Sequence, residues 1–408
     1  MLISQVLTWL LLITEILIAL PIIYVCILSI TAIVITKTSK AKNTNLPTTD
    51  ESPQYNFAIL VPAHNEEALL GKLLESLSAL AYPKEQLMVY VVADNCTDTT
   101  AELARPYDRV QVYERFDEVK RGKGFALEWI FQKLEEKQLI YDAYVIIDAD
   151  SVVEPAFLQF MAKYLAGGAQ ALQAHYTVLN MTESPSAGLR WIAFALQAHV
   201  RPLSRSRLGG SSTLTGNGMC FSRALLERCP WRAFSLSEDY EYYLTLVQNG
   251  ERVHYVPEAV VHSYMPTTFK AMRTQDIRWE SAGNGLTVWS ATRELLRAGL
   301  RLHSFVCFEA VAELLAPPLS FMMGWCILTL IASLLLWSPL AIGLSLLLIG
   351  GLIFYVGTAC YLLRPPLVVY RALLYAPGFM LWKLWVLLVL SRMKKYTSEW
   401  IRTSRPSS

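Results

Sequence analysis

Long apolar segments near both ends of the 408-residue chain restrict most strongly how it can fold. Residues Ile16 to Ile35 are predominantly apolar, and about twenty such residues in a helix cross the roughly 30 Å hydrocarbon core of a bilayer. Lysines follow this run directly, so the positive-inside rule predicts a cytosolic location for the next part of the chain. Residues 1–54 are therefore expected to form a transmembrane helix and a linker.

The apolar block at the other end divides into two predicted spans, Leu319 to Trp337 and Leu340 to Leu363, joined by a tight Ser-Pro turn. Basic residues after the second span predict a cytosolic tail. Residues 304–408 thus contain about two transmembrane helices, and a further crossing stays open.

Two other segments favour helices that lie in the membrane interface. Phe305 to Pro318 carries Glu309 and Glu313 at helical spacing, and Ala372 to Leu390 combines tryptophans with a central lysine. Glu15 falls just outside the first apolar run, so it is expected at an interface rather than in hydrocarbon.

The stretch between the membrane segments, residues 55–303, has the pattern of a cytosolic globular domain. Over the whole chain 53% of residues are hydrophobic and 17% are charged, but the apolar excess lies near the ends. A net charge of +2 gives no electrostatic case for binding nucleic acid. Seven scattered cysteines show neither zinc-ligand spacing nor a disulfide framework.

Short apolar runs alternate with helical patterns at the start of this domain. The expected strands are Phe57–Val61, Met88–Ala93, Val110–Tyr113 and Tyr144–Ile147, with helices between them. Such alternation predicts an α/β fold with a mostly parallel sheet. Ligands of such sheets bind beyond the carboxyl ends of the strands.

Polar and acidic residues follow three of the predicted strands. The first strand leads into Pro62, Ala63 and Glu66, the second into Asp94, and the fourth into Asp148 and Asp150, as the sequence shows. Any one of these acidic residues could simply cap a helix or end a strand. Their recurrence at three strand ends favours a shared site.

An Asp-x-Asp pair suits a divalent cation. In an extended segment the two carboxylates of Asp148 and Asp150 would point the same way. Mg²⁺ or Mn²⁺ held by one carboxylate and by phosphate oxygens would neutralise charge that develops on a diphosphate leaving group.

Two later motifs complete the candidate site. Glu238 and Asp239 begin a predicted helix, where an ionised carboxylate is favoured and could accept a proton from an attacking hydroxyl. Gln275, Arg278 and Trp279 share one face of another predicted helix and could contact pyrophosphate and a sugar ring. An acidic first turn and a surface salt-bridged helix are the respective structural alternatives.

Together these motifs resemble the membrane-bound family 2 inverting glycosyltransferases. That superfamily has a GT-A (nucleotide-diphospho-sugar transferase) fold and includes cellulose, hyaluronan and chitin-oligomer synthases and glycolipid glucosyltransferases. The resemblance covers about residues 55 to 300. It implies donor contacts from Pro62, Ala63, Glu66, Asp94, Lys123 and Asp148, a metal at Asp150, and Asp239 as the catalytic base. It also implies acceptor or pyrophosphate contacts from Glu238, Gln275, Arg278 and Trp279.

The expected reaction is metal-dependent transfer of a hexose from UDP-glucose or UDP-GlcNAc to a lipid or lipid-linked acceptor. The acceptor would be reached at the cytosolic face of the plasma (inner) membrane, which the chain crosses several times. A processive exopolysaccharide synthase, with a growing glycan as acceptor, is the close alternative, and a non-catalytic membrane scaffold is a third reading. A second copy of the chain or a secretion partner could join either enzyme.

Overall fold

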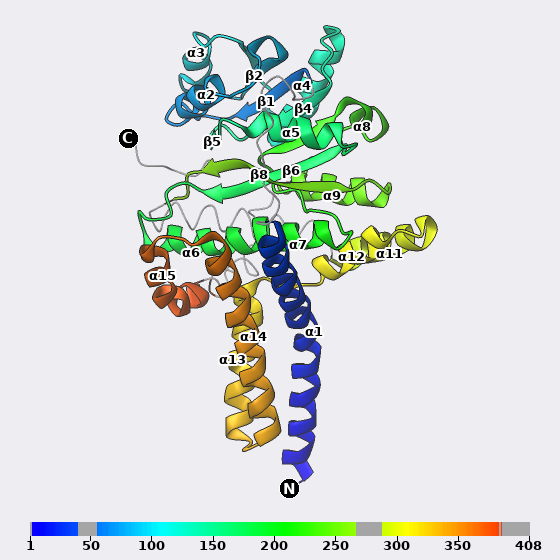
Figure 1. Cartoon of the computed structure of the whole chain (residues 1–408), viewed down its shortest axis with the longest axis vertical. Coiled ribbons are helices and arrows are strands. Elements are labelled where there is room, and N and C mark those ends of the chain that lie inside the picture. Colours follow the sequence, from blue (N-terminus) through cyan, green and yellow to red (C-terminus); the bar gives the residue numbers. More distant parts are fainter. Residues whose placement is uncertain (1, 40–54, 267–287, 383–384, 386–408) are drawn as a thin grey trace.

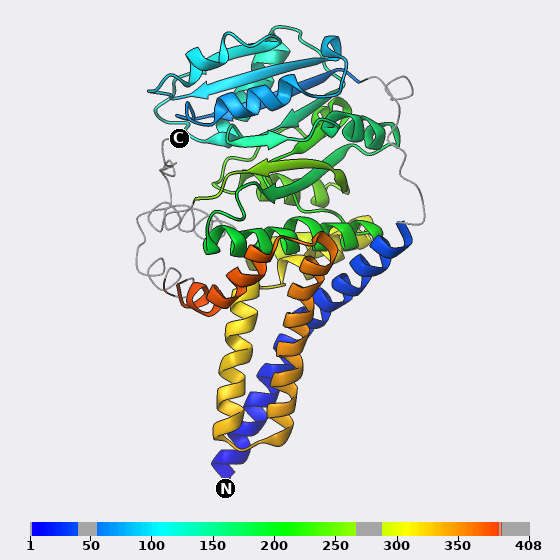
Figure 2. The same cartoon turned by 60° about the vertical axis from the view of Figure 1, so that its left-hand side comes forward.

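The computed structural model describes residues 2–39, 55–266, 288–382 and 385 of the chain. Within these residues, an α/β domain stands on a stalk of long apolar helices (Figure 1 and Figure 2). The first residues of the chain lie at the far end of the stalk, and the sheet lies at the opposite end.

Eight strands form one sheet in the described part of the chain, in the order β3-β2-β1-β4-β7-β6-β8-β5. Strands β1, β2, β3 and β4 pair in parallel, as the alternation of strands and helices predicts. In the other half, β7 is antiparallel to β4 and β6, β5 is antiparallel to β8, and β6 and β8 are parallel. The strand bounds are β1 Phe57–Ala63, β2 Leu87–Asp94, β3 Val110–Arg115, β4 Ala143–Ile146, β5 Ser151–Val153, β6 Ala171–Val178, β7 Met219–Ser222 and β8 Val253–Ser263.

Helices cover both faces of the sheet, because alternate strand residues point to opposite sides. Ile59 of β1 belongs to the core that contains α2 and α5, whereas Leu60 belongs to the core with α4 and α9. The helices of this domain are α2 Leu70–Ser78, α3 Thr100–Ala104, α4 Lys123–Glu136, α5 Phe157–Ala166, α6 Pro185–Phe194, α7 Arg201–Arg207, α8 Arg223–Arg228, α9 Glu238–Gln248 and α11 Val288–Leu302. A 3-10 turn, Lys84–Gln86, precedes β2, and a π-helical turn, Ala195–Val200, joins α6 to α7.

The stalk consists of α1 (Leu2–Ser39), α13 (Leu319–Leu335) and α14 (Pro339–Leu363), which pack against one another. Among the described residues, two helices are long and apolar enough to cross a membrane, within Gln5–Thr38 and Pro339–Leu363. Helices α12 (Phe305–Leu314) and α13 are bent by 58° relative to each other, and a third crossing results if the pair counts as one bent span. The remaining helix, α15 (Leu367–Ala372), is followed by a 3-10 turn at Leu373–Tyr375.

Glu15 differs from its predicted place at an interface. Helix α1 begins at Leu2, much earlier than the apolar run suggested, so Glu15 lies well inside it and is fully buried. Ser345 of α14 donates a hydrogen bond from its hydroxyl to Glu15 Oε1 at 2.5 Å. The carboxyl group therefore faces the interior of the helix bundle.

Helix α12 also differs from the predicted interfacial helix, because its acidic face is turned away from water. Glu309 and Glu313 pair with Arg205 and Arg201 of α7 at 2.5 and 3.1 Å. Phe305, on the same helix, is 58% exposed. We call the four charged residues the Arg–Glu cluster; it joins the apolar helices to the α/β domain.

Candidate active site

Lys123 brings together two other sequence-predicted residues, Asp148 and Glu238, from separate elements. It is the first residue of α4, directly after Gly122, whose φ of +121° suits glycine. Its Nζ lies 2.6 Å from Asp148 Oδ1 and 3.4 Å from Glu238 Oε1, and it donates a hydrogen bond to the carbonyl of Gly216. Burial alone would lower the pKa of Lys123, but the carboxylates of Asp148 and Glu238 raise it, so the ammonium group stays charged.

Asp239 follows Glu238 in the first turn of α9 and is half-buried. Burial, and next the charge of Glu238, raise the pKa of Asp239 to about 7, although Lys123 opposes the shift. Asp239 Oδ1 accepts a hydrogen bond from the Tyr240 amide at 2.8 Å. A carboxyl group that titrates near neutrality can accept a proton and later release it.

Asp148 and Asp150 lie in a turn rather than in extended chain, since β4 ends at Ile146. The Ser151 amide donates to the Asp148 carbonyl at 3.2 Å and closes the turn. The premise of an extended Asp-x-Asp segment is therefore wrong. Asp148 faces Lys123, whereas Asp150 Oδ1 accepts a hydrogen bond from the Ser151 hydroxyl at 3.3 Å.

Asp94 ends β2 and is fully buried. Arg115 Nη1 donates to Asp94 Oδ1 at 2.6 Å, while Oδ2 has no hydrogen-bond partner within the described residues. A buried oxygen without a donor is costly, so this atom is ready to accept a hydrogen bond from a ligand. Burial raises the pKa of Asp94, and Arg115 acts in the opposite direction.

Pro62 and Ala63 are the last residues of β1 and pair with Val92 and Ala93 of β2. They are buried and belong to the strand, not to the loop after it. Glu66 follows in the loop, where its amide donates to the Thr100 hydroxyl at 2.8 Å. This loop and the end of β2 lie side by side at one edge of the sheet.

A family model for glycosyltransferase like family 2 matches residues 53–282, more than half of the chain. The chain belongs to glycosyltransferase family 2. Relatives include β-monoglucosyldiacylglycerol synthases from Nostoc sp., 29% identical over 55% of this chain and 48% of the relative, and from Synechocystis sp., 26% identical over 73% and 64%. The chain thus spans only about half to two thirds of the length of these curated relatives.

The fold is also similar to that of a solved mannosyltransferase. The mannosyltransferase PcManGT from Pyrobaculum calidifontis, determined with GDP-mannose and Mn²⁺, superposes with a TM-score of 0.52 at 18% identity. The match covers 88% of this chain and 99% of that one. At this identity the likeness establishes the GT-A type of fold alone.

The carboxylates of this family 2 site could hold a divalent ion only together with phosphate oxygens of the substrate. Among the described residues, no three His, Cys, Asp or Glu side chains form a metal-binding group. Mg²⁺ and Mn²⁺ are commonly held by one or two carboxylates plus substrate phosphates, and a hard oxygen donor such as Asp150 suits either ion. The predicted Mg²⁺ or Mn²⁺ site is compatible with the structure in this form.

The loop Thr215 to Gly218 is a part of the site that the sequence analysis missed. Asn217 is fully buried; its Oδ1 accepts from the Asp148 amide at 3.1 Å, and its Nδ2 donates to Ser151 and Ser263 at 2.8 and 3.0 Å. Gly216 has a φ of +78°, and a Cβ there would lie 3.1 Å from Asp239 Oδ2. The Gly-Asn-Gly sequence was the available signal, since it is typical of left-handed turns.

Gln275, Arg278 and Trp279 lie outside the described residues. Their predicted contacts with the acceptor or pyrophosphate stay predictions.

Proposed function

We propose that this chain is an inverting glycosyltransferase that moves a hexose from a UDP-sugar to a lipid or lipid-linked acceptor at the cytosolic face of the inner membrane. The observation that carries the proposal is the meeting of Lys123, Asp148, Glu238 and Asp239 on a domain fixed to apolar helices. Family 2 membership and the names of its glucosyldiacylglycerol-forming relatives support glucose as the sugar and diacylglycerol as the acceptor class.

The reaction requires one proton transfer and one displacement at the anomeric carbon. Asp239 accepts the proton of the acceptor hydroxyl while the oxygen of that hydroxyl forms a bond to the anomeric carbon. The bond from the carbon to the diphosphate breaks, and its electron pair leaves with UDP. Asp239 suits the role of base because its pKa lies near neutrality.

Positive charge at the donor side stabilises the leaving group. Lys123 lies between Asp148 and Glu238, where its ammonium can approach the departing diphosphate. Mg²⁺ or Mn²⁺ at Asp150 would supply Lewis-acid stabilisation of the same charge. Asp94 Oδ2, which no donor reaches within the described part of the chain, would accept a hydrogen bond from the N–H of the uracil base.

The membrane arrangement belongs to the same proposal. Lys37, at the end of α1, and the lysines after it support a cytosolic catalytic domain by the positive-inside rule. Helices α1 and α14, with α12–α13 as a bent third span, would make the enzyme multi-pass.

The test follows UDP release by the full chain in lipid nanodiscs with Mg²⁺ or Mn²⁺. UDP-glucose and UDP-GlcNAc are supplied in turn with diacylglycerol, and products are separated by size. Asp239→Asn should lose turnover, whereas Asp108→Asn, an exposed aspartate at the start of the β3 region, should retain it. Addition of one sugar to the lipid supports the proposal. A ladder of long glycans would replace it with a polymer synthase, and equal release by both variants would refute the role of Asp239.

A further inference from the structure

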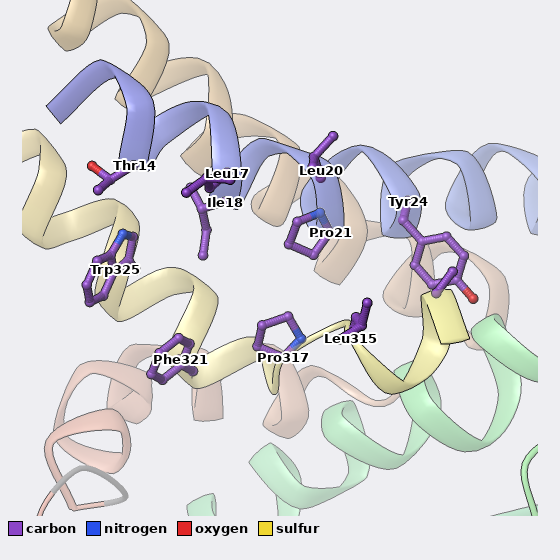
Figure 3. Close-up of a pocket in the computed structure, with 11 residues that line it drawn as sticks. Thr14, Leu17, Ile18, Leu20, Pro21, Tyr24, Leu315, Pro317, Phe321 and Trp325 are labelled. Carbon is purple, nitrogen blue, oxygen red and sulfur yellow. The ribbon is translucent and has the colours of Figure 1, made fainter. Parts of the chain in front are cut away.

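An apolar groove of about 480 Å³ lies on the stalk, between α1 and the bent pair α12–α13 (Figure 3). Residues of α1 form one wall, and residues of α12, α13 and the turn between them form the other. The lining residues are Thr14, Leu17, Ile18, Leu20, Pro21, Tyr24, Ala312, Leu315, Pro317, Phe321 and Trp325.

Prolines account for the existence of the groove. Pro317 and Pro318 separate α12 from α13, because proline cannot continue a helix from its interior. The axis bends by 58° between the two helices, so α12 turns away toward α7 while α13 continues along the stalk. Pro21 of α1 faces Pro317 across the gap (Figure 3), and neither side chain is large enough to fill it.

The groove is apolar along its length and polar at one end. The Thr14 hydroxyl donates to the Leu11 carbonyl at 2.7 Å, so its own helix satisfies it. At the other end, the Tyr24 hydroxyl lies 3.1 Å from Glu309 Oε1 and from Glu313 Oε2. The Arg–Glu cluster behind Tyr24 pairs each glutamate with an arginine, so this end is polar without a large net charge.

The dimensions match one leaflet of a bilayer. Ten residues of α1 separate Thr14 from Tyr24, which at 1.5 Å per residue gives a length of about 15 Å. This is half of the roughly 30 Å hydrocarbon core. Leu17 is 62% exposed and Phe321 is 44% exposed, so the groove opens sideways to whatever surrounds the stalk.

We propose that this groove binds one acyl chain of a glycerolipid from the leaflet nearest the catalytic domain. The chain lies along α1 with its glycerol end at Tyr24 and its methyl end near Trp325. Bilayer lipid is the occupant because α1 is long and apolar enough to cross a membrane and the groove opens beside it. The site goes beyond the proposed glycosyl transfer and does not require that this lipid be the acceptor.

The test uses the full chain in nanodiscs of phosphatidylcholine that carries a photoreactive diazirine on one acyl chain. After irradiation, labelled peptides are mapped by mass spectrometry, and label is expected on the groove walls, including the peptide with Phe321 and Trp325. Leu17→Trp fills the groove, whereas Ile16→Trp places the same side chain at a neighbouring position that is 59% exposed and does not line it.

Leu17→Trp should lower labelling of Phe321 and Trp325 by about fivefold or more, since the larger indole takes up the space that the acyl chain would occupy. Ile16→Trp should leave it unchanged. Uniform labelling around the stalk, or equal labelling in both variants, would show ordinary surrounding lipid and overturn the proposal. Cross-links between two copies of the chain at the groove would also overturn it. UDP release by the same samples identifies any variant that has lost its native fold.

Discussion

Replacing Glu309 by glutamine should weaken the attachment between the apolar helices and the catalytic domain. Glu309 Oε1 and Oε2 accept hydrogen bonds from Arg205 Nε and Nη2 at 2.5 and 3.0 Å. Oε2 also accepts from the Ser211 amide at 3.3 Å, and Tyr24 donates to Oε1 at 3.1 Å. Arg205 itself is only 1% exposed, so water cannot replace the lost carboxylate.

The magnitude follows from this geometry. Glutamine keeps one acceptor oxygen but turns an NH₂ group toward donors of Arg205 or Ser211, and it removes the negative charge. Glu313 lies 3.8 Å from Arg205 and compensates in part. Breaking a buried ion pair costs about 3–5 kcal/mol, and the partial compensation favours the lower end, ~3 kcal/mol. At roughly 2–4 °C per kcal/mol, Tm should fall by about 6–12 °C.

The assay is thermal unfolding in detergent, followed by intrinsic fluorescence, with Glu227→Gln as the matched control. Glu227 accepts from Arg223 Nε at 2.7 Å, a similar contact, but the two side chains are 59% and 47% exposed. Exposed pairs contribute about 0.3–0.5 kcal/mol, so the control should shift Tm by no more than about 2 °C. Equal shifts in the two variants would refute the reasoning that burial decides the cost.

Further predictions concern the site. The kcat/KM for transfer should fall as pH decreases through about 7, because protonated Asp239 cannot accept the proton of the acceptor hydroxyl. An ordinary aspartate would titrate near pH 4. A flat profile of kcat/KM between about pH 5 and 8 would contradict this prediction. Gly218→Ala places a Cβ 2.7 Å from Ala174 Cβ at a φ of +69°, so the free energy of unfolding should fall by roughly 2–4 kcal/mol. In Gly168→Ala the new Cβ meets nothing within 4 Å, so the free energy of unfolding should fall by only about 1 kcal/mol. Asp150→Asn should raise the Mn²⁺ concentration for half-maximal activity at least about tenfold, and EDTA should abolish turnover of the parent enzyme; an unchanged metal requirement would exclude Asp150 as a ligand.

The first half of the sheet was accessible from the sequence because its signals are local. The strands from Phe57 to Ile146 are short apolar runs separated by helical patterns, and parallel pairing follows from that order. The antiparallel pairing of Met219–Ser222 with β4 was not accessible, since β7 is only four residues long and its partner lies far away in the chain.

Clustering of the site residues followed from their positions at strand ends, but their geometry did not. Lys123 and Asp148, for both of which the resemblance implied donor contacts, lie together. The turn at Asp150 depends on Asn217, which reaches it from a loop about seventy residues later. Arg115 was missed because a single arginine in a strand carries no sequence signal until its partner Asp94 is known.

For the apolar segments too, the sequence predicted the elements but not the contacts between them. Hydropathy located α1 and α14, but it could not show that Glu15 faces Ser345 or that Glu309 faces Arg205. These contacts depend on which side of each helix meets a neighbour. Helix rotation is set by long-range packing, to which the average hydropathy of a window is insensitive.

The Arg–Glu cluster has a consequence for any attempt to prepare the catalytic part of this enzyme alone. A fragment from Tyr55 to Met265 would keep Arg201 and Arg205 but lose both glutamates, which come from α12. It would present two unpaired guanidinium groups on a newly exposed surface. It would also lack Val25 and Tyr355, which belong to the same hydrophobic core as β1. The apolar helices of this protein are therefore part of the folding unit of the transferase domain, and their removal should yield aggregated protein.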